Sequence, residues 1–207
     1  MRFIRNGCIT AALLLCSVVG LSCRDRSIPA AEDGRPKVPT TFTVLADLAR
    51  NVAGDRLQVQ SIVKPGSEIH GYQPTPSDIE GASDADLIIE TGLGLELWFR
   101  RFTAAAGPVP TLTLAGAMDP LLISEDAYTG KPNPHAWMSP KRTMAYVDRL
   151  EQAFTRLEPA GAETYSANAA AYKAQLQELD VDLRNTIEAL PANRRLLVSC
   201  EGAFSYL

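Results

Sequence analysis

Histidine is scarce in this chain of 207 residues, and the chain also lacks an excess of positive charge. Lys and Arg number 20 against 24 Asp and Glu, which gives a formal net charge of -4. A protein that holds nucleic acid needs a basic surface to neutralise phosphates, so nucleic acid is excluded as a partner. Hydrophobic residues make up 46% of the chain, which is typical of a folded globular protein.

The apolar run at the N-terminus is too short to span a membrane as a helix. Residues 11–21 are apolar or small and follow a basic start, whereas a spanning helix needs about 20 apolar residues. This pattern predicts a secretory signal over residues 1–22. Cys23 comes next and favours a lipoprotein signal, with Cys23 acylated. Gly20 departs from the usual pattern, so ordinary secretion and an uncleaved anchor remain alternatives.

Export of this kind predicts a protein of the cell envelope, in the periplasm or on the outer face of the cytoplasmic membrane, held by a lipid anchor. A disulfide scaffold is nevertheless excluded. Of the four cysteines, Cys8 and Cys16 belong to the expected signal and Cys23 would carry the lipid. Cys200 then has no partner.

The rest of the chain predicts an α/β fold. Residues 23–39 contain prolines and charges without apolar periodicity and predict a tether, so we expect the fold to begin at Thr40. Residues 40–138 alternate strand and helix patterns, which indicates a lobe built on a parallel sheet. The expected strands are residues 41–45, 56–63, 86–90 and 111–114.

Residues 139–190 predict helices, the second of which has no interior Pro or Gly from residue 162 to 190. At 1.5 Å per residue it would extend roughly 40 Å, longer than one small lobe is wide. Residues 191–207 then predict the start of a second α/β lobe, with a strand at 195–199. A single strand cannot bury both its faces, so we expect this lobe to be truncated.

The two histidines, His70 and His135, both lie in loops that contain prolines. Loops after the strands of an α/β sheet are where ligands gather, and imidazole is a ligand for zinc, manganese, iron, copper and nickel. Taken alone, the pair is compatible with a metal site and equally with exposed or helix-capping side chains.

Four segments resemble the cluster A-I metal-binding lipoproteins, the extracytoplasmic receptors that deliver zinc or manganese to an ABC importer. The segments are PGSEIHGYQPTPSD (65–78), TGLGLELW (91–98), NPHAWMSP (133–140) and SCEGAFSY (199–206). They occur in the family's order. The resemblance implies a two-lobed metal-receptor fold, α/β with parallel sheets and a long linking helix, whose second lobe is mostly missing here.

The resemblance also implies the ligands. His70 and His135 would be the two ligands of the first lobe, and Glu201 the third. Glu in place of a third His makes the site harder and favours Mn²⁺, with Zn²⁺ or Fe²⁺ as alternatives. The fourth family ligand, an Asp, lies beyond these residues. The implied partner is an ABC permease in the cytoplasmic membrane, and a monomer is expected.

Three alternatives differ in class from a metal receptor. A metal-dependent hydrolase would use an open position on a three-ligand metal, but no residue is marked as a general base, so we expect no enzyme. A role in cell adhesion has no binding patch in its favour. The third alternative is a non-functional truncated receptor.

Overall fold

A four-stranded parallel sheet forms the centre of the fold. The computed structural model describes residues 34–124, 126–197 and 202–207. The strands follow the order β2-β1-β3-β4, with Val38 beside Val59 and Ile89 beside Leu112. Their bounds are β1 Lys37–Thr40, β2 Gln58–Ser61, β3 Ile88–Glu90 and β4 Thr111–Thr113.

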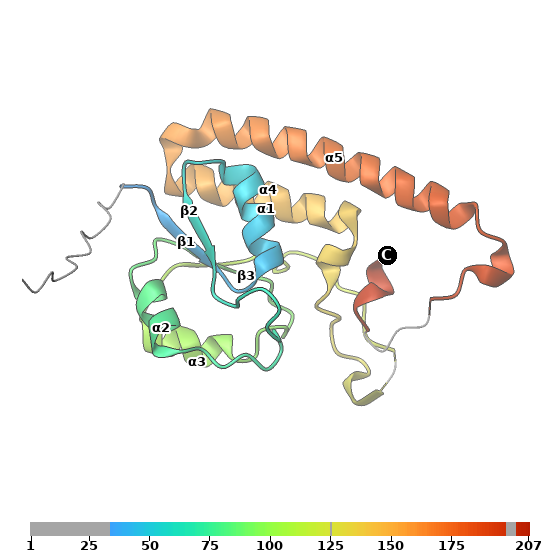
Figure 1. Ribbon diagram of the computed structural model, residues 1–207, viewed down its shortest axis with the longest axis horizontal. Coiled ribbons are helices and arrows are strands. Elements are labelled where there is room, and N and C mark those ends of the chain that lie inside the picture. Colours follow the sequence, from blue (N-terminus) through green and yellow to red (C-terminus); the bar gives the residue numbers. More distant parts are fainter. Residues whose placement is uncertain (1–33, 125, 198–201) are drawn as a thin grey trace, which may run out of the picture. The chain divides into compact units, whose positions relative to one another are not determined.

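Five α-helices lie in the described part of the chain, on two sides of the sheet (Figure 1). Right-handed crossovers put α1 on one face, and the reversal of direction after β2 puts α2 and α3 on the other. α4 and α5 contact α1 and each other. The helices are α1 Thr43–Ala53, α2 Pro76–Ser83, α3 Phe99–Ala106, α4 Pro140–Leu157 and α5 Ala162–Glu188. The expected α/β architecture with a parallel sheet is confirmed.

The core contains buried side chains from both helical layers, including Phe99 and Phe102 of α3. Val147, Leu150 and Phe154 recur along α4 at spacings of three and four and are fully buried. This spacing places them on one face of the helix. The consecutive β3 residues Ile88 and Ile89 are equally inaccessible, so both faces of the sheet are covered, because successive side chains of a strand point to opposite faces.

The first strand does not lie where the sequence pattern predicted it. β1 occupies Lys37–Thr40, so the last residues of the expected tether belong to the sheet, and Thr43 to Leu45 of the expected strand belong to α1. Phe42 is still extended and serves as the N-cap residue of α1. Pairing with β2 and β3 on both sides stabilises a segment whose own sequence, with Pro39 inside it, predicts no strand.

The long helix α5 has 27 residues and lies alongside α4 (Figure 1). Its first half buries Tyr165 and Ala169, and Leu176 is 8% exposed. The same face then continues as an open apolar stripe, with Leu179 47% and Ile187 37% exposed. No helix among the described residues is long and apolar enough to cross a membrane.

The strand expected at residues 195–199 is absent from the part of it that the structure describes. Residues 195–197 have no regular structure, and Leu196 is 81% exposed. A strand needs a neighbour with which to form hydrogen bonds, and no described strand pairs with this segment. Its last two residues lie outside the described part of the chain.

Candidate functional site

His70 lies in the loop between β2 and α2, and a tryptophan of another loop holds this loop in place. Trp98 donates a hydrogen bond from Nε1 to the carbonyl oxygen of Ile69, at 2.9 Å. The rings of Trp98 and Tyr72 meet edge to face, 5.3 Å apart. Tyr72 in turn donates to the carboxylate of Asp78 in the first turn of α2. The backbone beside His70 is therefore fixed, while its imidazole is exposed.

His135 lies in the loop that leads into α4. Its ring packs against Trp137, with centroids 5.2 Å apart, and Trp137 packs against Phe42 at 5.1 Å. Phe42 follows the carboxyl end of β1, as the His70 loop follows that of β2. Both histidines thus lie at the carboxyl edge of the parallel sheet, where α/β folds bind ligands.

The two imidazoles meet at this edge. Their ring centroids are 5.5 Å apart and the planes are inclined by 63°, although the residues are far apart in sequence. Within the described residues, no third His, Cys, Asp or Glu joins them to complete a metal-binding group. Glu201, the expected third ligand, and Cys23, the expected lipidation site, lie outside those residues, as does Cys200.

The chain directly after Glu201 contacts the His135 loop. Residues Gly202–Tyr206 form a 3₁₀ turn, and Asn133 donates from Nδ2 to the carbonyl oxygen of Gly202 at 2.9 Å. The hydroxyl of Tyr206 donates to the backbone carbonyl of Asn133 at 2.7 Å. Two hydrogen bonds therefore hold the segment that follows Glu201 against the His135 loop.

Glu68 lies close to His70 but does not contact its ring. Glu68 accepts a hydrogen bond from the backbone N–H of His70 at 2.8 Å and is exposed. An exposed loop acid was one of two interpretations of this residue, the other being a partner that orients the imidazole. The observed contact supports the first interpretation, since it stabilises the turn and leaves the ring nitrogens untouched.

A buried carboxylate, Glu96, organises the loop between β3 and α3. It is 5% exposed and accepts hydrogen bonds from the Thr41 hydroxyl at 2.8 Å and the Thr91 N–H at 2.8 Å. A third donor is the N–H of Gly92, at 3.2 Å. Burial raises the pKa of Glu96 above its ordinary value, against the opposing effect of these donors. Glu96 thereby ties the ends of β1 and β3 to the loop that carries Trp98.

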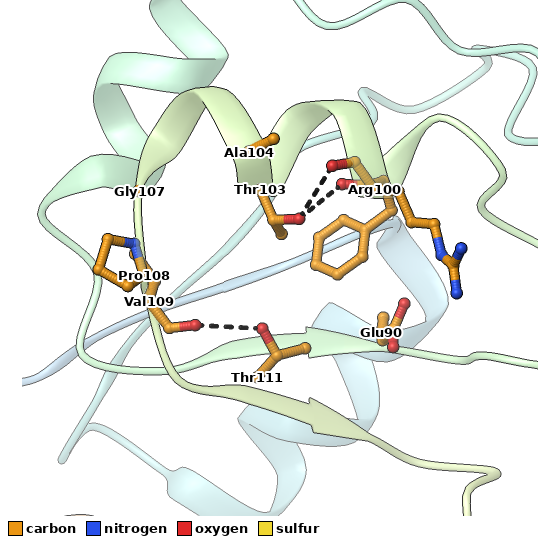
Figure 2. Close-up of a pocket in the computed structure, with 9 residues that line it drawn as sticks. Glu90, Arg100, Thr103, Ala104, Gly107, Pro108, Val109 and Thr111 are labelled. Atoms are coloured by element: carbon orange, nitrogen blue, oxygen red, sulfur yellow. Dashed lines mark hydrogen bonds between the residues drawn. The ribbon is translucent and has the colours of Figure 1, made fainter.

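A cavity of about 680 Å³ lies elsewhere, between α3 and the ends of β3 and β4 (Figure 2). Neither histidine lines it. Thr103 and Thr111 bond to backbone carbonyls of their own segments, and the carboxylate of Glu90 accepts from Thr113 at 2.6 Å. The two threonine hydroxyls and the Glu90 carboxylate of this cavity are thus engaged locally, and the histidine pair remains the candidate site.

Sequence reasoning missed Asn133, Trp98 and Glu96 as supports of the site. All three stand inside the segments that carried the family resemblance. A Trp and an amide in loops have no periodicity, and the local sequence does not mark Glu96 as a buried residue. Their position inside the segments that resemble the family is the only signal in the sequence that could have pointed to them.

A protein-family model described as zinc-uptake complex component A, periplasmic, matches residues 38–207. Among curated proteins, the iron-binding protein YfeA of Yersinia pestis is 42% identical over 205 residues, which is 99% of this chain and 66% of that protein. The manganese-binding lipoprotein MntA of Halalkalibacterium halodurans is 34% identical over 200 residues, 96% of this chain and 66% of MntA. The chain thus spans about 66% of the length of these relatives.

A solved structure supports the same relationship. The Mn-bound periplasmic metal-binding protein from Candidatus Liberibacter asiaticus has a TM-score of 0.76 and 31% identity. The match covers 83% of this chain and 64% of that one. The names of all these relatives are those of binding proteins, in agreement with the expectation that the chain is not an enzyme.

Proposed function

The chain belongs to the periplasmic zinc-uptake component A family, and we propose that it captures a divalent metal ion outside the cytoplasmic membrane and passes it to an ABC importer. Membership makes it a protein of the cell envelope, as its N-terminal signal predicts. The single observation that carries the proposal is the meeting of His70 and His135 at the carboxyl edge of the sheet. They are the only two histidines in the chain.

The separation of the rings fits a shared metal ion. Two imidazoles at about 2.1 Å from one ion, at a tetrahedral angle, would hold their ring centroids roughly 5.3 Å apart. The observed separation is 5.5 Å. Trp98 and Asn133 fix the two loops that carry the histidines, which favours a preformed pair of ligands.

Manganese is the metal that we propose as substrate, with iron and zinc as alternatives. Glu201 would supply a carboxylate beside the two imidazoles, and such a mixed site is harder than one made of imidazoles alone. Relatives are named for iron and for manganese, which fits such a donor set. Zinc binding in vitro would not contradict a manganese role, since the affinity order of divalent metals generally favours zinc.

The proposed delivery requires a partner and an anchor. The partner is the permease of an ABC importer, and the anchor is a lipid on Cys23. A relative is named as a lipoprotein, which supports the anchor. We expect the receptor to act as a monomer.

Titration of the purified protein with Mn²⁺, Fe²⁺ and Zn²⁺ tests the binding. We expect H70A and H135A each to abolish stoichiometric binding, because each removes one of two imidazoles. The matched control is E68Q, which changes an exposed acid beside His70 without touching the ring. Binding unchanged in the H70A/H135A double variant would reject the proposal. Metal analysis of protein from its own cells, with E201Q compared in vitro, then decides between manganese, iron and zinc.

A further inference from the structure

The side chain of Asn133 is buried, 3% exposed, and its amide oxygen faces His135. This oxygen accepts the backbone N–H of His135 at 3.0 Å and lies 2.9 Å from its ring Nδ1. A backbone N–H can only donate, so the atom that faces it must be the oxygen and not the amide nitrogen. The ring nitrogen beside the same oxygen must therefore carry a hydrogen.

The other groups of Asn133 face the C-terminal segment. Its amide nitrogen donates to the carbonyl oxygen of Gly202 at 2.9 Å, and its backbone carbonyl accepts from the hydroxyl of Tyr206 at 2.7 Å. The same hydroxyl accepts the N–H of Leu121 at 2.9 Å. The guanidinium of Arg142 covers the Tyr206 ring, 4.6 Å from its centroid. Every polar group of the amide is thus used, with one side turned to His135 and the other to the segment.

We propose that Asn133 is a positioning residue that holds His135 in its Nδ1–H tautomer and ties it to the segment Gly202–Tyr206. The tautomer leaves Nε2 as the nitrogen that can bind a metal ion. The tie to Gly202 sets the position of this segment relative to His135. The significance for metal capture rests on the proposed function, whereas the tautomer itself is a property of the metal-free protein.

A spectrum of the imidazole nitrogens tests the tautomer directly. The chain contains two histidines, so a long-range ¹H–¹⁵N spectrum of the labelled metal-free protein shows two imidazoles, and H70A assigns them. At about pH 8.5, where free imidazole is neutral, we expect His135 of the wild type to show the Nδ1–H pattern. A wild-type spectrum with the Nε2–H pattern at His135 would overturn the proposal.

Two variants of Asn133 separate its roles. N133A removes both sides of the amide, and we expect His135 to move towards the Nε2–H form that free histidine prefers. N133D keeps an acceptor for His135 but cannot donate to Gly202. We expect N133D to retain the Nδ1–H tautomer, with the Nδ1 proton shifted downfield because a carboxylate is the stronger acceptor. An unchanged Nδ1 proton in N133D would contradict the proposal even if N133A failed to fold.

Hydrogen exchange tests the tie to the C-terminal segment. We expect the amides of residues 204–207 to exchange faster in both N133A and N133D than in the wild type. The matched control is Y206F, which breaks the hydroxyl bridge: it should loosen the same amides and leave the His135 tautomer unchanged. Exchange that is unaffected in N133D would refute the tie.

Titration with Mn²⁺ alone tests whether positioning of His135 by Asn133 contributes to metal binding. Partners that orient metal-bound histidines are typically worth 10–100-fold in affinity, so we expect N133A to bind Mn²⁺ roughly 10–100-fold more weakly. Failure of the proposed function would appear as Mn²⁺ binding that survives in H70A/H135A. Failure of the present proposal would appear as wild-type tautomer and affinity in N133A, so the two failures are distinguishable.

Discussion

Trp98 and Ile69 are joined by a hydrogen bond of 2.9 Å, from the indole Nε1 to the carbonyl oxygen that directly precedes His70. Trp98 is 8% exposed and packs edge to face on Phe99 and Phe102 of α3. The bond thus connects the position of His70 to the α2–α3 side of the sheet. It joins two loops that follow different strands, β2 and β3.

Replacing this tryptophan should weaken the metal site. W98F keeps an aromatic ring at the N-cap position of α3 but leaves the Ile69 carbonyl without its donor, so we expect Mn²⁺ affinity to fall several-fold. The free energy of unfolding should fall by about 1–2 kcal/mol. Isothermal titration and urea denaturation measure the two effects. L97A, at a neighbouring side chain that is 75% exposed, should change neither, and wild-type affinity in W98F would count against a role for this bond.

Glu96 should make the stability of the protein depend on pH. Its pKa is raised by burial above the ordinary 4.5, so between that value and the native pKa the folded state holds more protons than the unfolded chain. Stability from this group therefore decreases as pH rises through that window. E96Q cannot ionise, so the advantage of the wild type over E96Q should be largest near about pH 4 and shrink as pH rises.

Urea denaturation of wild type and E96Q over a series of pH values measures this difference. The control is E80Q, which alters an exposed acid on α2, and its curve should run parallel to that of the wild type. If the stability advantage of the wild type over E96Q grew with pH, the pKa of Glu96 would be lowered by folding and the prediction would be wrong.

Glu158 should give stability the opposite dependence on pH from that given by Glu96. The Arg56 guanidinium donates to its carboxylate, with Nε at 2.7 Å, and Tyr165 donates at 2.6 Å. These bonds lower the pKa of Glu158 to about 2. The stabilisation of the folded state by the ionised Glu158 carboxylate is therefore complete above the ordinary pKa of 4.5, and it is lost as pH falls from 4.5 towards about 2.

We therefore expect the melting temperature of E158Q to lie below that of the wild type at neutral pH, with the two values converging in acid. D180N is the matched comparison, because it removes a pair with Arg184, whose side chain is 61% exposed. Such an exposed pair contributes little to stability, so D180N should unfold close to the wild type. A difference in melting temperature between wild type and E158Q that stayed constant down to acid pH would contradict the lowered pKa of Glu158.

Gly92 and Gly94 should respond differently to alanine. Both have positive φ, +86° and +81°, which costs an L-residue roughly 1–2 kcal/mol. A Cβ on Gly92 would also lie 2.4 Å from Cγ2 of Thr113, whereas one on Gly94 meets nothing within 4 Å. We expect G92A to destabilise the fold by about 1–3 kcal/mol more than G94A does.

The clash can be relieved from the other side. T113S removes Cγ2 and retains the hydroxyl that donates to Glu90, so G92A/T113S should recover part of the stability lost in G92A. Chemical denaturation of the wild type, G92A, G94A, T113S and G92A/T113S provides the comparison. Equal losses in G92A and G94A would show that the backbone conformation alone accounts for the cost.

Local sequence signals predicted several elements well. Thr75, Pro76 and Asp78 are residue types that typically start a helix, and the structure shows a complete capping box there, at the start of α2. The absence of Pro and Gly from residue 162 onward predicted α5, which ends at Glu188. The helical region expected from residue 139 likewise begins with α4 at Pro140. These signals act within one or two turns of chain, so the sequence contains them completely.

The same reasoning failed where pairing decides the structure. β1 has Pro39 within it and little apolar pattern, yet it lies between two strands that supply its hydrogen bonds. The Arg195 to Leu197 segment has the opposite character, since it is apolar in part and has no described strand beside it. Strand formation depends on a neighbour, which a local pattern does not reveal.

The sequence by itself determined the α/β class, the long helix α5, and the two histidines as the candidate ligands of the first lobe. Only the tertiary structure brought those histidines within 5.5 Å of each other and chose Trp98, Glu96 and Asn133 to hold their loops. The reason is physical. Helix signals arise from neighbours along the chain, whereas a metal site is made of groups whose spacing depends on how the sheet pairs and how distant loops bond to one another.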